Sequence, residues 1–111
     1  MKIIKNSFEG IKVAAEILKE NGVVAFPTET VYGLGANAFS QEAVAKVYKI
    51  KNRPSFNPLI IHVSGYNMAK KYGVFNELAK KLTEKYWPGP LTIVVERKNS
   101  EIVEAATARL Q

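Results

Sequence analysis

The sequence predicts one α/β or α+β layered domain, because strand-like and helix-like segments alternate along the chain. Three short apolar runs rich in branched residues are bounded by Gly, Pro or polar residues, as buried strands are; they span residues 22–26, 59–63 and 91–96. Segments with apolar residues at helical spacing separate these runs. Such alternation is typical of helices layered on a sheet, and 111 residues suffice for one domain with a modest core.

The first helix is expected before the first strand. Its apolar residues recur at helical spacing, with charged residues mostly on the other faces. They are Phe8, Ile11, Ala14, Ala15 and Leu18. The pair Asn21-Gly22 then provides a C-terminal stop, because both residue types tolerate the left-handed backbone that ends many helices.

Three further helices are expected along the rest of the chain. Ser40 is a capping residue for a helix that runs to about Ile50. Residues 76–86 have helical spacing, and residues 100–108 are expected to form a short last helix. Together with the three strands, these segments account for most of the chain.

Composition restricts the chemistry. The chain has no Cys, so it offers no disulfide, thiol nucleophile or thiolate metal site. It has a single histidine, His62, and no Asp, so neither a multi-histidine site nor a carboxylate-rich metal cage is expected. No metal ligands are assigned, and a Mg²⁺ ion, if used, would be held mainly by substrate phosphates.

The net charge of +6 favours anionic partners such as a nucleotide or RNA. An ordinary basic protein with lysines on solvated helix faces would have the same charge. The first residues lack the apolar core of a signal peptide, and the apolar runs are too short to span a bilayer. We therefore expect a cytoplasmic protein without membrane association.

The stretch 22–35 is the most informative part of the sequence. An apolar strand pattern breaks at Pro27, and a polar stretch precedes two glycines, Gly33 and Gly35. The polar side chains are Thr28, Glu29, Thr30 and Tyr32. A strand, a polar loop and glycines in this order are typical of a site for a small polar ligand in an α/β fold. In the alternative interpretation, the two threonines cap a turn and Tyr32 is half-buried.

A second polar cluster lies in residues 51–58, which contain Pro and Asn and are expected to form a loop. Lys51 offers a mobile point charge and Arg53 a planar fork, a pair suited to binding phosphates. The alternative is a solvated helix end whose cations complement the helix dipole. His62, in the next expected strand, is either a hydrogen-bonded core residue or a group that faces the ligand.

Four stretches resemble the YrdC-like family of threonylcarbamoyl-AMP synthases. They are Val24-Ala-Phe-Pro-Thr-Glu-Thr-Val-Tyr-Gly-Leu34, Val47-Tyr-Lys-Ile-Lys-Asn-Arg-Pro54, Asn57-Pro-Leu-Ile-Ile-His-Val63 and Trp87-Pro-Gly-Pro-Leu-Thr92. Each is weak alone, but their order and spacing are specific. The resemblance covers residues 9–107 and implies a twisted mixed β-sheet flanked by helices.

The resemblance also implies an activity. The family condenses L-threonine, bicarbonate and ATP to threonylcarbamoyl-AMP and releases pyrophosphate, a nucleotidyl transfer. Its product is used by downstream transferase proteins to make threonylcarbamoyladenosine in tRNA. ATP would be a substrate, and Mg²⁺ would accompany its phosphates.

Site residues carry over by motif. The resemblance implies that Thr30 and His62 hold the substrate threonine. Thr28 and Tyr32 would line the same pocket. Lys51, Arg53 and Asn57 would contact the nucleotide phosphates, with Lys51 and Arg53 as the catalytic pair.

The family domain normally continues with a Val-Arg-containing strand and a Ser-x-Asn motif, which this sequence lacks. We therefore expect residues 1–111 to be the N-terminal portion of a single truncated YrdC-like domain, which would leave its activity open. Two alternatives have no synthase activity. One is a module that binds double-stranded RNA or tRNA, and the other is a carbamoyl-transfer domain that uses carbamoyl phosphate.

Overall fold

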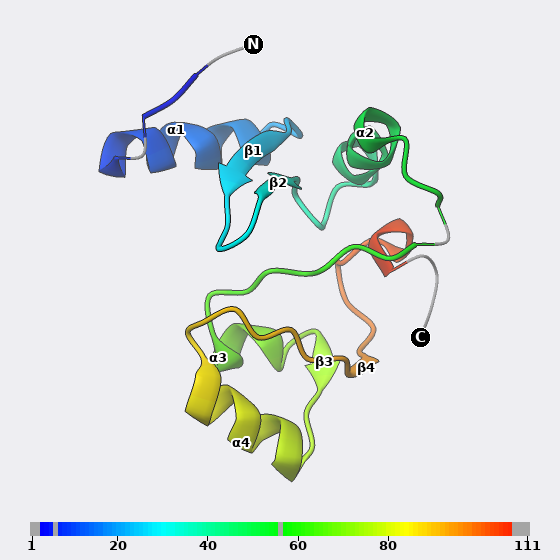
Figure 1. The fold of residues 1–111 in the computed structure, drawn as a ribbon. Coiled ribbons are helices and arrows are strands. Elements are labelled where there is room, and N and C mark those ends of the chain that lie inside the picture. The colour runs from blue at the N-terminus through cyan, green and yellow to red at the C-terminus, as the bar shows by residue number, and fades with distance from the viewer. Residues whose placement is uncertain (1–2, 6, 56, 108–111) are drawn as a thin grey trace. The chain divides into compact units, whose positions relative to one another are not determined.

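The computed structural model describes residues 3–5, 7–55 and 57–107. The chain divides into two compact units, Met1–Ser55 and Phe56–Gln111, which we call unit 1 and unit 2. Helices and short strands occur in both units (Figure 1), so the predicted α/β class is confirmed.

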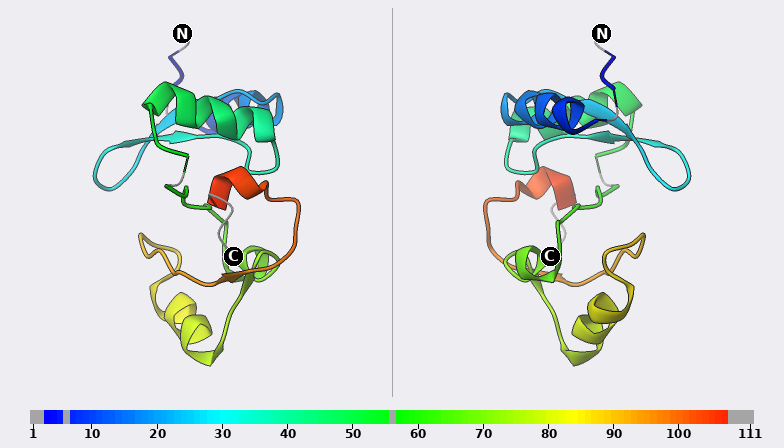
Figure 2. Two further views of the ribbon diagram at one scale, coloured as in Figure 1. Left: turned by 90° about the vertical axis from the view of Figure 1, so that its right-hand side faces the viewer. Right: turned by 90° about the vertical axis from the view of Figure 1, so that its left-hand side faces the viewer.

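Unit 1 is built from two helices and a hairpin. The order is α1 (Phe8–Lys19), β1 (Val24–Pro27), β2 (Tyr32–Gly35) and α2 (Gln41–Lys51). The two strands pair antiparallel, with Pro27 opposite Tyr32 at the end of the ladder. Figure 2 shows the turn of this hairpin projecting beyond the two helices of unit 1.

Both ends of α1 follow from its sequence. At the N-terminus, the Ser7 hydroxyl accepts a hydrogen bond from the Gly10 N–H at 3.1 Å. At the C-terminus, Asn21 has a φ of 64°, and the Gly22 N–H donates to the Ile17 carbonyl at 2.8 Å. This six-to-one bond after a left-handed residue is a Schellman ending. The expected helix and its stop at Asn21-Gly22 are confirmed.

Helix α2 supplies the buried apolar residues of unit 1. The Ser40 hydroxyl caps it by accepting from the Ala43 N–H at 3.1 Å, as expected. Ala43, Val44 and Val47 are all at most 2% exposed. The end of α1 is tied to α2 because the Lys46 ammonium donates to the Asn21 carbonyl at 3.0 Å.

The described part of unit 2 contains two short helices, one longer helix and one strand pair. The order is α3 (Tyr66–Ala69), β3 (Gly73–Val74), α4 (Glu77–Tyr86), β4 (Glu96–Arg97) and the 3₁₀ helix η1 (Glu104–Thr107). Strands β3 and β4 pair antiparallel. The expected helices over 76–86 and 100–108 are confirmed as α4 and as the shorter η1; residue 108 lies outside the described residues.

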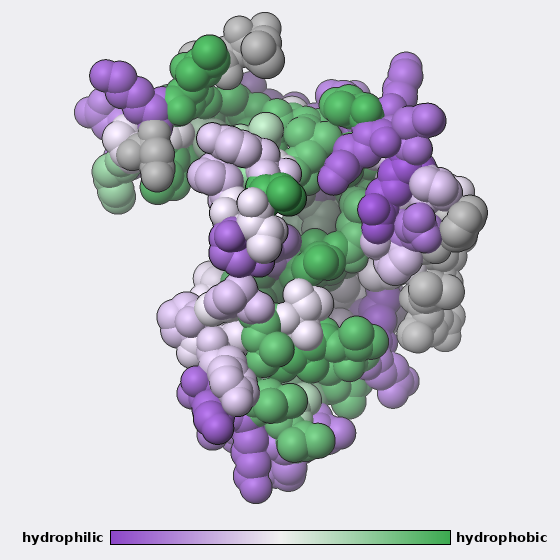
Figure 3. Space-filling model, viewed as in Figure 1, coloured by the Kyte–Doolittle hydropathy of each residue, from purple (hydrophilic) through white to green (hydrophobic). Residues whose placement is uncertain are grey.

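Packing in unit 2 combines an aromatic cluster with small buried side chains. The Phe75 ring meets the Tyr66 and Trp87 rings edge-on, at centroid distances of 5.4 and 6.4 Å. The buried residues among the described part of this unit are Ala69, Gly73, Ala79, Thr83, Ile102 and Ala106. Figure 3 shows apolar surface gathered over the part of unit 2 that holds α3, β3 and α4.

Two of the expected strands are wrong. Residues 59–63 have no strand partner, and within 91–96 only Glu96 lies in a strand. Both segments alternate between half-buried and exposed side chains, and Val94 is 97% exposed. This alternation of burial fits an extended, pleated backbone. A strand also requires a neighbouring strand with which it exchanges hydrogen bonds. The described residues form two separate two-stranded antiparallel sheets.

The first expected strand is confirmed with a shifted boundary. It begins at Val24 rather than at residue 22 and continues to Pro27. Its side chains alternate between half-buried and exposed, so it is not the fully buried strand that the sequence indicated. Within the described residues, no helix has both the length and the apolarity needed to cross a membrane.

Candidate functional site

The turn between β1 and β2 carries the first predicted cluster. The Thr28 hydroxyl accepts hydrogen bonds from the Val31 N–H at 3.2 Å and the Thr30 N–H at 3.4 Å. The same hydroxyl donates to the Val31 carbonyl, which also accepts the Thr28 N–H at 3.1 Å. Thr28 therefore holds the turn, as in the alternative interpretation of this residue.

The turn presents its remaining side chains to solvent. Val31 and Tyr32 are 71% and 75% exposed, and Thr30 is exposed as well. Tyr32 is thus not the half-buried residue of the alternative interpretation. An exposed hydroxyl and phenol on a fixed turn can both donate and accept hydrogen bonds, which suits a ligand with mixed polar groups.

The glycines of β2 leave room for an aromatic ring of β1. A Cβ atom on Gly33 would lie 3.2 Å from Cζ of Phe26, and one on Gly35 would lie 2.8 Å from Cε1 of the same ring. Phe26 and Gly33 are directly opposite in the ladder. The close approach at these two glycines is therefore made by the chain's own Phe26.

The second cluster lies at the C-terminal end of α2. Lys51 is the last helical residue, so the expected loop begins one residue later, at Asn52. Asn52 has a φ of 51°, in the left-handed region, and the Arg53 N–H donates to the Tyr48 carbonyl at 2.9 Å. The backbone therefore turns sharply between the two cations, which lie at one helix end.

This helix end is electrostatically suited to cations. The unpaired carbonyls at a helix C-terminus carry partial negative charge, which stabilises nearby lysines. Lys49 and Lys51 occupy the last turn of α2. Lys51 is exposed and Arg53 is half-buried. The Lys51 side chain can therefore reach an anion in solution, while the half-buried side chain of Arg53 has fewer conformations open to it.

The other two predicted residues belong to unit 2. Asn57 is half-buried just before the 59–63 segment, and His62 is exposed within it. The backbone here is held from η1, because the Leu59 N–H donates to the Ala106 carbonyl at 2.8 Å. The structure thus groups Thr28 and Thr30 of the turn with Tyr32, the first residue of β2, on one hairpin, and it places the two cations at one helix end. Both clusters lie within unit 1.

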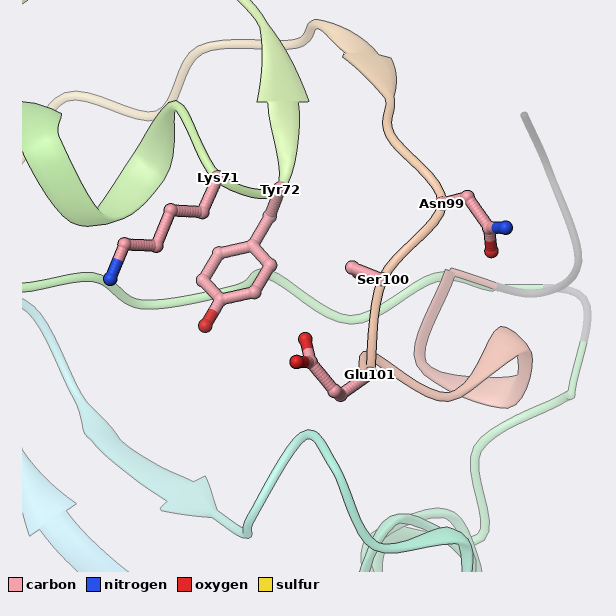
Figure 4. A pocket seen from close by; sticks show the side chains of 5 residues that line it. All are labelled: Lys71, Tyr72, Asn99, Ser100 and Glu101. Carbon is pink, nitrogen blue, oxygen red and sulfur yellow. The ribbon is translucent and has the colours of Figure 1, made fainter.

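A pocket in unit 2 was not predicted. Residues just before β3 and just after β4 line it, near the end of the strand pair where Gly73 meets Arg97: Lys71, Tyr72, Asn99, Ser100 and Glu101. Tyr72 and Glu101 extend toward the same space in Figure 4. These residues carry no spacing that sequence reasoning could have detected, because the pairing of Gly73 with Arg97 brings the two segments together.

No metal centre is assigned to the site. Among residues 3–5, 7–55 and 57–107, no three His, Cys, Asp or Glu side chains are grouped so that they could hold a metal ion. The predicted contacts to a polyphosphate come from the Lys51 ammonium and the Arg53 guanidinium, which have no acceptor atom, and from the amide of Asn57, whose NH₂ group can donate.

Comparison with known families places the chain. Residues 16–111 match the Sua5_yciO_yrdC family, described as "Telomere recombination". This match covers most of the chain, so the chain belongs to that family. The resemblance expected from the four sequence stretches is confirmed.

Relatives in this family carry a common name. The chain is 48% identical to the threonylcarbamoyl-AMP synthase of Bacillus subtilis over 102 residues, which are 91% of this chain and 30% of the relative. It is 46% identical to the threonylcarbamoyl-AMP synthase of Pyrococcus abyssi over 97 residues, 84% of this chain and 27% of that relative. The chain thus spans about a third or less of these two proteins' lengths.

Solved structures agree with the sequence relatives. The crystal structure of P. abyssi Sua5 complexed with L-threonine matches with a TM-score of 0.88 at 39% identity, over 96% of this chain and 31% of that one. The H234A/Y235A variant of the same protein matches equally well. The described fold is therefore that of one part of Sua5.

Proposed function

We propose that this chain belongs to an L-threonylcarbamoyladenylate synthase and supplies contacts to L-threonine and to the phosphates of ATP. The observation that carries the proposal is the 48% identity to the B. subtilis synthase across 91% of the chain. The likeness to a Sua5 structure that holds L-threonine supports it. Residues 1–111 would then be the N-terminal portion of one YrdC-like domain.

The proposed reaction has two bond-forming steps. The amine of L-threonine attacks the carbon of bicarbonate and forms a carbamate with loss of water. A carbamate oxygen then attacks the α-phosphorus of ATP, and the bond to the β-phosphate oxygen breaks to release pyrophosphate. Neither step requires a covalent intermediate with the protein, which accords with a chain that has no Cys.

The proposed residue roles follow from the two clusters of unit 1 and from unit 2. Thr30, on the hairpin turn, and His62, in unit 2, would hold the substrate threonine, with Tyr32 lining the same pocket. Lys51 and Arg53 would bind the phosphates and neutralise charge that develops on them, with Asn57 as a further donor. Positioning and charge stabilisation of this kind supply most of the catalysis in phosphoryl chemistry.

The metal and the wider pathway are also proposals. ATP would bind with Mg²⁺ coordinated mainly by its own phosphates, because Mg²⁺ in nucleotide sites takes few protein ligands. The product would pass in the cytoplasm to transferase proteins that modify tRNA. The net charge of +6 would favour the approach of nucleotides and of tRNA.

Pyrophosphate release tests the proposed function. The 111-residue chain is incubated with ATP, Mg²⁺ and bicarbonate, with and without L-threonine, and its folding is checked by circular dichroism. We expect release that depends on L-threonine. A folded chain that neither releases pyrophosphate nor binds L-threonine in a calorimetric titration would contradict the proposed contacts.

A further inference from the structure

We propose that Thr28 is a positioning residue, whose hydroxyl fixes the hairpin turn that presents Thr30, and that it does not itself bind the substrate threonine. The inference rests on the proposed function and refines it, since family resemblance alone would put Thr28 in the pocket. It is carried by the hydrogen bonds that the Thr28 side chain makes within its own turn.

The hydrogen-bonding capacity of the Thr28 hydroxyl is fully used. A hydroxyl has one proton to donate and two lone pairs to accept with. Its proton goes to the Val31 carbonyl, and its lone pairs accept the N–H groups of Thr30 and Val31. A ligand could bind this oxygen only by displacing one of these three bonds.

Thr30 has the complementary arrangement. Its backbone N–H is directed to the Thr28 hydroxyl, which fixes where its Cα lies. Its side chain is exposed and, among the residues that the structure describes, has no hydrogen-bond partner. The two threonines therefore have different roles. Thr28 holds the backbone of the turn, and Thr30 offers its hydroxyl to the ligand.

The ladder next to the turn supports this division. Pro27 pairs with Tyr32, so residues 28–31 form the whole connection between the strands. The Thr28 N–H also donates to the Val31 carbonyl at 3.1 Å, which keeps the turn closed by a backbone bond. Removal of the hydroxyl should therefore loosen the turn without unfolding the hairpin.

Three variants of the 111-residue chain test the proposal. Thr28→Val keeps the side-chain shape and removes all three hydroxyl bonds, Thr28→Ser keeps the hydroxyl, and Thr30→Val removes the hydroxyl offered to the ligand. Amide hydrogen exchange of Thr30 and Val31 is measured by NMR. Affinity for L-threonine is measured in parallel by titration, and circular dichroism confirms that each variant folds.

We expect Thr28→Val to speed exchange at the Thr30 and Val31 amides about two- to tenfold, as expected from the loss of ordinary hydrogen bonds. It should weaken L-threonine binding, and Thr28→Ser should restore both properties. Thr30→Val should weaken binding while exchange at Val31 stays unchanged.

The proposal is overturned if Thr28→Val weakens binding while exchange at both amides is unchanged, because Thr28 would then contact the ligand. It is also overturned if Thr28→Ser restores neither property. If the wild-type chain binds no L-threonine, the proposed function fails instead. The exchange measurements then still decide whether Thr28 holds the turn.

Discussion

The ring of Phe26 lies over Gly35, so that a Cβ atom on the glycine would be 2.8 Å from Cε1 of the ring. This is closer than two carbon atoms approach without strain. Packing therefore explains why glycine is needed at position 35. Backbone conformation does not explain it, since the described part of the chain has no glycine with positive φ. The ring and the glycines together fix the strands that carry the Thr28–Val31 turn.

Gly35→Ala should destabilise the protein because the added methyl group meets the Phe26 ring. Overpacking of this kind costs about 1–3 kcal/mol. Chemical denaturation of the variant measures the loss. Gly65→Ala is the matched control, because within the described residues no atom beyond its two chain neighbours lies within 4 Å of its added Cβ. Equal stabilities of the two variants would show that the ring does not occupy this space.

A double-mutant cycle isolates the contact itself. Phe26→Leu removes the ring edge, so Gly35→Ala in that background should cost less than in the wild type. A coupling energy of about 0.5 kcal/mol or more is expected for residues in direct contact. Strictly additive effects would contradict the close approach.

Asn52 should accept glycine but not a branched residue. Its φ of 51° lies in the left-handed region, where glycine has no penalty, Asn is tolerated, and branched residues lose about 1–2 kcal/mol or more. Asn52→Gly should therefore keep the free energy of unfolding, and Asn52→Val should lower it. Of these two variants, only Asn52→Val should bind ATP more weakly than the wild type in a titration, since the turn sets the directions of Lys51 and Arg53. Equal ATP affinity in both variants would contradict this and show that the conformation of the turn does not affect phosphate binding.

Lys51 and Arg53 should matter for pyrophosphate release far more than for folding. Loss of one charge-stabilising contact typically lowers the rate on the order of a hundredfold. Lys51→Ala and Arg53→Ala are each compared with Lys49→Ala, which removes a cation from the same last turn of α2. We expect Lys49→Ala to keep most of the rate and all three variants to unfold near the wild-type temperature. Wild-type turnover by either of the first two variants would rule out the phosphate contacts.

Arg97 connects β4 to the segment that leads into η1. Its guanidinium donates to the Thr107 hydroxyl at 2.7 Å and to the Ile102 carbonyl. Arg97→Lys should cost about 1–3 kcal/mol, because one ammonium cannot reproduce the planar fork. Thr107→Val removes the bond from Arg97 and also the bond that the Thr107 hydroxyl donates to the Glu104 carbonyl at 3.1 Å. It should still cost less in the same denaturation experiment, because the charged guanidinium keeps its bond to the Ile102 carbonyl. A larger loss from Thr107→Val would contradict this ranking.

The local features of the fold could be predicted because neighbouring residues determine them. Ser40 and the pair Asn21-Gly22 mark helix ends, since a side-chain cap or a left-handed residue acts within one helical turn. The hairpin after Pro27 was missed, although a four-residue polar stretch between two apolar runs is a known hairpin connection. The strand was expected, but its partner was not.

Non-local features could not be predicted from the same patterns. Residues 59–63 have the composition of a strand, yet a strand exists only where a partner offers ladder hydrogen bonds, and sequence periodicity carries no information about that partner. The pocket beside Tyr72 and Glu101 depends on the pairing of β3 with β4 in the same way. The residues of the candidate site stay predictions, while the use of the Thr28 hydroxyl within its own turn required coordinates.

The most direct test of the proposed function is product formation by a chimera. In the B. subtilis synthase, the stretch that matches this chain over 102 residues is replaced by the sequence of this chain. The chimera is supplied with ATP, Mg²⁺, L-threonine and ¹³C-bicarbonate, and its products are analysed by mass spectrometry. We predict threonylcarbamoyl-AMP that carries the heavy carbon and that disappears when L-threonine is omitted or Lys51 is replaced by Ala. A folded chimera that makes no such product, under conditions in which the parent synthase does, would contradict the assignment.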